Sequence, residues 1–168
     1  LKDLISSDCI PVVELKDIFR QSAQSLIITN AHAIVHGELP ELEHTDNDFF
    51  FLGRPNLETT AKTIGDLCAV RLPKSYQYSP FDDIQVICPS RKTIIGTVEL
   101  NKLIQSRINP AEKGKQEFSF GLYTFREYDK VMQVRNNYDI RWKKDGEEGQ
   151  GIFNGDIGRI VKIQRGTG

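Results

Sequence analysis

Apolar residues follow two kinds of pattern along the first two thirds of the chain. Residues 10–15 and 84–88 are short, almost continuous apolar runs, which predict strands buried on both faces in a parallel sheet. Over about 22–36, 57–72 and 97–109, apolar residues recur every three or four positions, the spacing of a helix with one face on a core. Strands that alternate with helices favour an α/β domain built on a parallel sheet.

Helix-breaking residues indicate where these helices should stop. Gly37 follows the first helix, and Pro73 and Pro110 follow the second and third, so each is expected to mark a C-terminal end. Residues 48–53 have the sequence DFFFLG, which predicts a short aromatic strand or edge segment.

The pattern changes after the charged linker AEKGKQE at residues 111–117. Short β-rich runs are then separated by the turn-forming strings RNNYD, KDGEEGQG and FNGDIG. Asn154-Gly155 predicts a hairpin turn, because both positions tolerate a positive φ. We therefore expect a small, strongly bent all-β unit from about residue 118.

Composition adds limits on size, charge and redox state. The chain has 168 residues, 39% of them hydrophobic, and a formal net charge of -1. A chain of this size and composition can bury a hydrophobic core. Its near-neutral charge argues against nucleic-acid binding through bulk charge but leaves binding through a local basic stripe as an alternative. Cys9, Cys68 and Cys88 are widely spaced among apolar residues and predict reduced core thiols. No paired Cys or His spacing supports a metal site.

The ends of the chain and the absence of long apolar runs suggest its context. No run approaches the roughly 20 residues that span a bilayer, and no signal peptide opens the chain, which favours a soluble cytoplasmic protein. The opening LKDLISS has the character of a helix already under way, and the ending QRGTG follows a strand directly. We therefore expect a piece of a longer protein.

Cations follow both predicted parallel strands. Arg20 and Gln21 follow the first strand, and Ser90, Arg91 and Lys92 follow the second. Ligands collect at the carboxyl ends of the strands in an open α/β sheet, and an arginine placed there can bind a phosphate with its planar fork of donors. The alternative for Arg20 is that it caps a helix or pairs with a surface carboxylate.

Two further clusters each have a functional and a structural interpretation. Arg91 and Lys92 precede a helix that opens near Gly96-Thr97, where free N–H groups could hold a nucleic-acid phosphate; the alternative is a solvated loop with a threonine N-cap. The β-rich tail interleaves cations with aromatic residues, which predicts either a platform for single-stranded bases or the core of a barrel. These residues are Lys130, Arg135, Arg141, Lys143 and Lys144, with Phe125, Tyr138, Trp142 and Phe153.

Several kinds of catalytic pattern are missing from the sequence. There is no phosphate-binding loop of the form G-x-x-x-x-G-K-[ST], and no Ser/His/Asp, Cys/His or paired-carboxylate arrangement. His32, His36 and His44 have the surroundings of helix and loop residues, without a catalytic or metal role. We therefore expect the chain to lack a complete active site.

Four strings, taken together, resemble one family. IFRQ, DIQVICPSRKTIIGTVELNKLIQSRINP, DKVMQVRNNYDIRW and GIFNGDIGRI occur in this order over nearly the whole chain. They resemble the C-terminal motor region of RecD-like helicases, the exodeoxyribonuclease V alpha-subunit group of superfamily-one DNA helicases. The family usually has a glycine before DKVMQ, where this chain has Tyr128, which puts the geometry of that turn in question.

The resemblance implies a domain organisation. Residues 1–9 would be the tail of a first motor domain, and residues 10–117 a partial second RecA-like motor domain with the parallel sheet of P-loop NTPases. Residues 118–168 would be an inserted SH3-like β-barrel. The fold class is therefore expected to be α/β, a partial RecA-like sheet with helices plus this small barrel.

The resemblance also implies site residues. Arg20 would contact the γ-phosphate of ATP held by the other motor domain, with Gln21 in support. ATP and Mg²⁺ would bind the full-length parent, and neither is expected on this chain alone. The single-stranded DNA track would include Arg91, Lys92, Thr97 and Asn101, and Lys130, Gln133, Arg135, Asn136 and Asn137.

The resemblance predicts part of an ATP-dependent 5′-to-3′ DNA helicase or translocase that is inactive alone. Its partners would be single-stranded DNA, the first motor domain of the same parent and helicase–nuclease subunits, with no membrane. The alternative is a non-enzymatic adaptor that binds nucleic acid or protein through the β-barrel.

Overall fold

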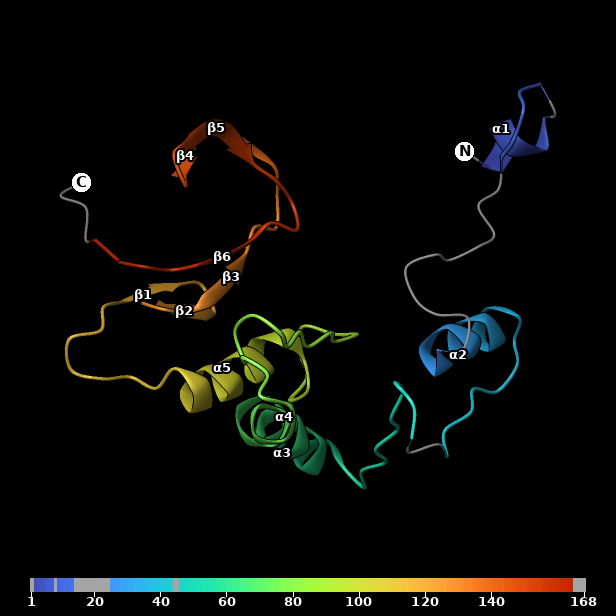
Figure 1. The fold of residues 1–168 in the computed structure, drawn as a ribbon, viewed down its shortest axis with the longest axis horizontal. Coiled ribbons are helices and arrows are strands. Elements are labelled where there is room, and N and C mark those ends of the chain that lie inside the picture. The colour runs from blue at the N-terminus through green and yellow to red at the C-terminus, as the bar shows by residue number, and fades with distance from the viewer. Residues whose placement is uncertain (1, 8, 14–24, 44–45, 165–168) are drawn as a thin grey trace. The chain divides into compact units, whose positions relative to one another are not determined.

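The computed structural model describes residues 2–7, 9–13, 25–43 and 46–164 (Figure 1). The chain divides into two compact units, Leu1–Gly53 and Arg54–Gly168, which are described separately. Arg20 and Gln21 lie outside the described residues, so the predictions made for them stay predictions.

The first unit contains α1 (Lys2–Ser6) and α2 (Leu26–Val35). Helix α2 ends as predicted at Gly37, whose φ is 78°, because Glu38 N donates to Ala33 O at 2.8 Å and Gly37 N to Ile34 O at 3.1 Å. These two hydrogen bonds form the motif in which a left-handed glycine satisfies the last free carbonyls of a helix.

A carboxylate from a distant loop caps the start of α2. Asp48 accepts hydrogen bonds from Ser25 Oγ and from the backbone N–H of Leu26, at 2.9 Å, and of Ile27, at 3.3 Å. The bond from Ser25, and then those from the backbone, hold the pKa of Asp48 below its usual range. The first N–H groups of α2 are therefore already bound to an anion of the chain itself.

The second unit opens with a long helical stretch, α3 (Leu57–Asp66), the π-helical turn η1 (Leu67–Arg71) and α4 (Leu72–Tyr76). The prediction that Pro73 ends this helix is wrong, since the stretch continues to Tyr76. Leu72 N donates to Leu67 O across the wider π turn. Pro73 then lies in the first turn of α4, where a missing N–H costs little.

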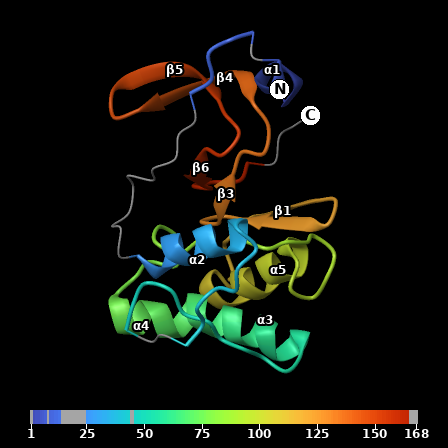
Figure 2. The same cartoon turned by 90° about the vertical axis from the view of Figure 1, so that its right-hand side faces the viewer.

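Helix α5 (Thr97–Ile108) follows its predicted bounds closely and lies against α3 and η1 (Figure 2). The buried apolar residues of these helices are Ala61, Cys68, Val98 and Leu100. Arg107 pairs with Asp66, and a Cβ at Gly65 would lie 2.9 Å from Arg107 Nη1. The glycine therefore allows the arginine to cross α3 closely.

The three thiols are free, as predicted, but only Cys68 belongs to the core. Cys9 is exposed and Cys88 is half-buried. Burial raises the pKa of the Cys68 thiol. The prediction of core positions for Cys9 and Cys88 is therefore wrong.

Within the described part of the chain, neither the two predicted parallel strands nor a strand at the aromatic segment 48–53 forms. Residues 10–13, 48–53 and 84–88 carry no strand. Over 84–88 the side chains alternate between half-buried and exposed, as in a strand, and Ile87 is 90% exposed. A strand requires a neighbouring backbone to satisfy its N–H and C=O groups, and the described residues provide none beside these runs.

The β part of the second unit, residues 117–164, contains six short strands. They pair as β1–β2, β3–β6 and β4–β5, so the described residues form three two-stranded antiparallel sheets rather than a closed barrel. The strands are β1 (Glu117–Phe120), β2 (Tyr123–Arg126), β3 (Lys130–Met132), β4 (Asn137–Lys144), β5 (Glu147–Ile152) and β6 (Ile157–Arg159).

Turn chemistry selects the local hairpins. Asp145 and Gly146 join β4 to β5 with φ values of 52° and 88°, the positive pair that a type I′ hairpin requires. Asn154-Gly155 also forms a turn, with Asp156 N bonded to Phe153 O at 3.0 Å. This turn joins β5 to β6, which pair with different strands, so the hairpin predicted there is wrong.

Tyr128 adopts a backbone conformation that favours glycine. It is the third residue of the turn Arg126–Asp129, in which Asp129 N donates to Arg126 O at 3.0 Å, and its φ is 75°. This positive φ is typical of a type II turn. Tyr128 N also donates to Ile160 O at 2.6 Å, which holds the strained residue in place.

A network of buried polar groups joins the end of α5 to this turn and to the β1–β2 hairpin. Arg126, 8% exposed, donates from Nε to Glu117 Oε1 at 2.6 Å and from Nη1 to Asn109 O. Asn109, 3% exposed, donates from Nδ2 to Glu127 O at 2.9 Å and to Asp129 Oδ1 at 2.8 Å. Buried polar groups are tolerated only when they are bonded, so these contacts lock the elements together.

Two side chains from outside the turn complete the network. Gln105 Nε2 donates to Thr124 O at 2.8 Å and to Asp129 Oδ2 at 2.6 Å, and Lys115 Nζ donates to Asn109 Oδ1 at 2.9 Å. Within the described ranges, every buried side-chain nitrogen and oxygen has a hydrogen-bond partner. The network is therefore complete as it stands.

Glu127 links the network to the last described residues. Its carboxylate accepts hydrogen bonds from Ile163 N at 3.0 Å and Gln116 N at 3.3 Å. These backbone donors hold the pKa of Glu127 below its usual range. A carboxyl of this kind stabilises the fold above its unfolded pKa of about 4.3 and loses that contribution as the pH falls through the folded pKa.

The positive φ of Tyr128 predicts that glycine stabilises the fold more than alanine at this position. Tyr128→Gly and Tyr128→Ala both remove a side chain that is 46% exposed. Because φ is positive, we expect the glycine variant to have the larger free energy of unfolding, by about 1 kcal/mol. Urea unfolding of the two variants measures the difference. An alanine variant as stable as the glycine variant would contradict the strain.

The hydrogen bonds of Glu127 predict a stability that depends on pH. Between about pH 4.5 and pH 3 the free energy of unfolding of the unaltered chain should fall more steeply than that of Glu127→Gln, because glutamine does not titrate. Urea unfolding at a series of pH values measures both slopes. Glu147→Gln, at an exposed position of β5, is the matched control and should keep the full slope. A Glu127→Gln variant with that same slope would contradict the assignment.

Candidate nucleic-acid interface

A compact loop, residues 90–96, precedes α5 and carries the first predicted cluster. It closes through hydrogen bonds from Thr97 N to Ser90 O at 3.1 Å and from Gly96 N to Thr93 O at 2.7 Å. A Cβ on Gly96 would lie 2.7 Å from the carbonyl carbon of Arg91, so only glycine permits this closure. The loop is therefore a defined turn rather than a loosely solvated one.

The predicted residues of this loop lie on its surface and at the start of the helix. Arg91 and Lys92 are exposed, Thr97 is half-buried and Asn101 is exposed one turn further along α5. The N-cap is Gly96, without a capping side chain, so the alternative of a threonine N-cap is wrong. The cations thus lie beside a helix start that has no side-chain cap, the arrangement that suits a phosphate.

Arg91 already has a partner in the β part. Its Nη2 donates to Tyr123 Oη, on β2, at 3.1 Å. This bond joins the loop to the β1–β2 hairpin across 32 residues of sequence. Other donors of the guanidinium stay available, since a hydroxyl oxygen occupies one of five N–H groups.

The second predicted cluster, residues 130–137, is held mainly by its own backbone and amide groups. Gln133 N donates to Asp156 O at 2.9 Å, and Gly155 N donates to Gln133 O at 2.9 Å. Asn136 Oδ1 accepts from Asn154 N at 2.9 Å, and Asn137 Oδ1 accepts from Asp139 N at 3.1 Å. These amides therefore build the loop between β3 and β4.

Two cations of this cluster have different surroundings. Lys130 is half-buried, and its Nζ donates to Ile84 O at 3.1 Å. Arg135 is exposed, and no hydrogen bond or ion pair of its side chain is found within the described residues. Arg135 is thus better placed than Lys130 to reach a ligand in solvent.

The aromatic residues of the tail do not form a barrel core. Tyr138 and Trp142 lie on β4, Phe153 directly follows β5, and Phe125 lies on β2. Tyr138 and Phe153 meet edge to face with ring centres 5.8 Å apart, and they are 65% and 45% exposed. Trp142 donates from Nε1 to Gly151 O at 3.1 Å, and its indole covers Gly149, where a Cβ would collide with the ring. Lys143 pairs with Glu148 at 2.6 Å.

The network described above relates the two predicted clusters. It joins α5, which carries Thr97 and Asn101, to the turn that leads into β3 and Lys130. Its central residues, Asn109 and Arg126, were not among the residues predicted from the sequence. A charged string, FREYD, within a β-rich run was the signal that could have indicated a buried polar turn.

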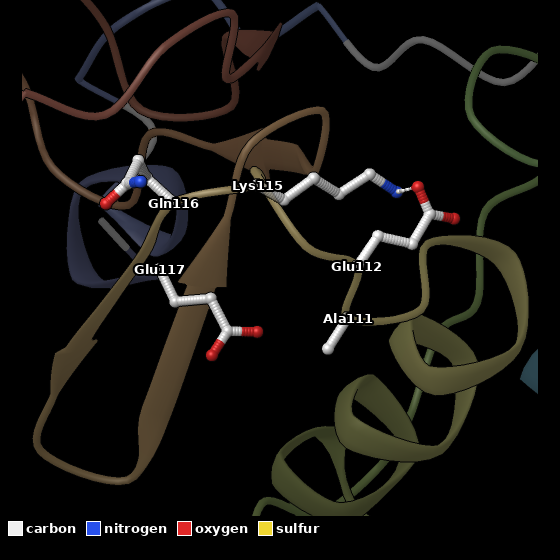
Figure 3. A pocket seen from close by; sticks show the side chains of 5 residues that line it. All are labelled: Ala111, Glu112, Lys115, Gln116 and Glu117. Carbon is white, nitrogen blue, oxygen red and sulfur yellow. Dashed lines mark ion pairs between the residues drawn. The ribbon is translucent and has the colours of Figure 1, made fainter.

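Two surface hollows lie away from most of the predicted residues. The first, of about 370 Å³, is lined by Ala111, Glu112, Lys115, Gln116 and Glu117, and Lys115 reaches across it to Glu112 at 3.3 Å (Figure 3). The second, of about 440 Å³, is lined by residues of α3 and α5 and by Ile94.

In the part of the chain that the structure describes, no group of three or more His, Cys, Asp or Glu side chains is placed to hold a metal ion. No helix among the same residues is long and apolar enough to cross a membrane.

Comparison with known proteins relates the chain to one group of helicases. Residues 100–168 match the family described as the SH3 domain of ATP-dependent RecD-like DNA helicases. The chain is 30% identical over 154 residues, 92% of its length, to the ATP-dependent RecD2 DNA helicase of Deinococcus radiodurans. It spans 18% of the length of that relative.

Residues 100–168, the range that matches the family, correspond to the β part and the end of α5. This range begins within α5 and includes the polar network and all the strands described above. The helices and short antiparallel sheets are consistent with such a domain, without a closed barrel. The comparisons support the resemblance seen in the four sequence strings: the chain is similar to a RecD-like DNA helicase, and residues 100–168 are similar to the SH3 domain of such helicases.

Proposed function

We propose that this chain is part of an ATP-dependent 5′-to-3′ DNA helicase or translocase of the RecD-like kind. In this proposal it supplies one side of the ATP cleft and part of the single-stranded DNA track, and it does not hydrolyse ATP alone. The observation that carries the proposal is the match of residues 100–168 to the helicase SH3 family. The alignment to one such helicase, which covers 92% of the chain at 30% identity, supports the proposal further.

The finer domain assignment is also a proposal. Residues 1–9 would end a first motor domain, residues 10–117 would belong to a second RecA-like motor domain, and residues 118–168 would form the SH3-like barrel. Helices α3 and α5 and the extended run 84–88 support the second assignment, because such a run becomes a strand once a neighbour pairs with it.

The DNA track in this proposal follows the exposed polar residues on both sides of the network. Arg91, Lys92 and Asn101 would contact phosphates from the helical side, and Arg135 from the loop between β3 and β4. The closed loop 90–96 supports this, since it fixes the cations beside the start of α5. Thr97, Gln133, Asn136 and Asn137 would shape these surfaces.

The ATP-binding part of the proposal rests on the resemblance. Arg20 would contact the γ-phosphate of ATP and Gln21 would support it, facing the first motor domain of the same parent. Mg²⁺ would accompany the nucleotide there. Helicase–nuclease subunits are further proposed partners, and the cytoplasm is the proposed location.

Binding of single-stranded DNA should be weak and sensitive to salt. We expect Arg91→Ala and Arg135→Ala each to weaken binding of a fluorescent oligothymidine and to reduce the slope of log affinity against log salt by about 0.7, the value for one phosphate contact on a single strand. Fluorescence anisotropy at several salt concentrations measures the slope.

A matched cation serves as the control for this experiment. Lys74→Ala, at an exposed position of α4, should leave both affinity and slope unchanged. If all three variants lost affinity equally, binding would depend on net charge rather than on the proposed track.

Hydrolysis of ATP separates the helicase proposal from the adaptor alternative. The 168-residue chain should show no turnover above background with single-stranded DNA present. In a full-length parent, Arg20→Ala should abolish ATP hydrolysis and leave DNA affinity within a few-fold, because phosphate sensing and DNA contacts are separate. A coupled ATPase assay measures ATP hydrolysis, and fluorescence anisotropy measures DNA affinity. Turnover by the chain alone, or a parent without ATPase activity, would count against the proposal.

A further inference from the structure

Residues 79–83 form a tightly hydrogen-bonded turn between α4 and the extended run 84–88. Asp83 N donates to Ser79 O at 3.0 Å, and Ser79 N donates to Asp83 Oδ2 at 2.7 Å. Ser79 Oγ also donates to Asp82 Oδ2 at 2.7 Å. Because its two ends are bonded to each other, the turn presents the Phe81 ring and the following Ile84 carbonyl in fixed positions.

Two cations on the β part contact this turn. Strands β3 and β6 form an antiparallel pair (Figure 1), in which Lys130 of β3 is directly opposite Arg159 of β6. Lys130 Nζ donates to Ile84 O at 3.1 Å, and Arg159 Cζ lies 4.3 Å from the centre of the Phe81 ring. Like charges placed opposite each other repel, so the pair requires outside partners on this face.

The partners of the two cations are neutral, which makes the contact depend on geometry. Arg159 Nε also donates to Tyr128 O at 3.2 Å, which orients the guanidinium over the ring. A planar guanidinium can stack on an aromatic face in a way that a lysine ammonium does not reproduce. At position 159, arginine is therefore expected to make this contact better than lysine, although both carry the same charge.

The contact is separate from the other attachments of the β part. Those attachments, which are the polar network of Asn109 and Arg126 and the bond from Arg91 to Tyr123, hold the β1–β2 hairpin and the turn before β3. The bond from Lys130 to Ile84 spans 46 residues of sequence. Together with the contact of Arg159, this bond attaches the β3–β6 pair to the turn 79–83 and so fixes the angle of that pair on the helical part.

We propose that Phe81, Lys130 and Arg159 form a latch that holds the β part on the helical part, residues 54–110. Lys130 is then a positioning residue and not a phosphate ligand. The proposal deepens the proposed function, and only its DNA readout rests on that function. The latch keeps the cations of the loop 90–96 and Arg135 in one arrangement, so that a single DNA strand meets both.

Hydrogen exchange without DNA tests the latch directly. In the 168-residue chain, Lys130→Met, Arg159→Lys and Phe81→Leu should each raise amide exchange over residues 79–86 by about five-fold or more, because the turn loses its contact. Lys130→Arg restores a donor and should stay within about two-fold of the unaltered chain. Lys74→Met, the exposed control, should also stay within that limit.

The combined variant adds a check on the pairing. Phe81→Leu with Arg159→Lys should raise exchange no more than either change alone, because both remove the same contact. Arg159→Lys keeps the charge and is the mildest change, so it stays informative if Phe81→Leu unfolds the chain by circular dichroism. Unchanged exchange in Lys130→Met and Arg159→Lys would overturn the latch.

Binding of oligothymidine gives the second readout. Phe81→Leu changes no charge, and we expect it to weaken binding about three-fold with an unchanged salt slope, because only the arrangement of the cations is lost. A fall of about 0.7 in the slope for Lys130→Met, with unchanged exchange, would make Lys130 a phosphate ligand and overturn the proposal. Failure of the unaltered chain to bind would count against the proposed DNA track and would leave the exchange test of the latch intact.

Discussion

The buried guanidinium of Arg126 is the constraint on which the β part depends. Removing such a charge from water is costly, and here Glu117 and the Asn109 carbonyl accept its hydrogen bonds. Asn109 in turn uses both ends of its amide. Because these partners come from α5, from the hairpin and from the turn before β3, none of the three can move without leaving a buried polar group unbonded.

This polar joint replaces what a larger apolar core would otherwise provide. Isolated two-stranded sheets are marginal in water, and the β part has three of them among the described residues. Its strands and loops carry exposed apolar residues, such as Phe120 of β1 at 69% and Val134 of the loop between β3 and β4 at 75% exposure. Directional hydrogen bonds from the network and the turns therefore determine how the strands are arranged. Under the proposed function, other domains of a longer parent would cover such apolar surface.

The same geometry divides the candidate DNA residues by role. Lys92 and Arg135 have exposed side chains, and Arg91 is exposed while it also bonds to Tyr123. The side chains of Lys130, Gln133 and Asn136 make the hydrogen bonds that hold their own loops and strands. Residues within the string DKVMQVRNNYDIRW can therefore serve to position their neighbours rather than to bind DNA. The strain at Tyr128 is another example, since its turn needs the conformation that glycine adopts most easily.

Local patterns in the sequence were sufficient to predict elements that depend on contacts between residues three or four positions apart. They predicted α5, the end of α2 at Gly37 and the beginning of the β part near residue 118. They did not predict that the helix would pass Pro73, which required a π turn, or that Asn154-Gly155 would join strands of different sheets. The tertiary structure decided these points, together with the missing parallel strands and the bonds of Lys130 and Arg126. Strand pairing and buried polar contacts join residues far apart in sequence, and no local spacing encodes which partner they find.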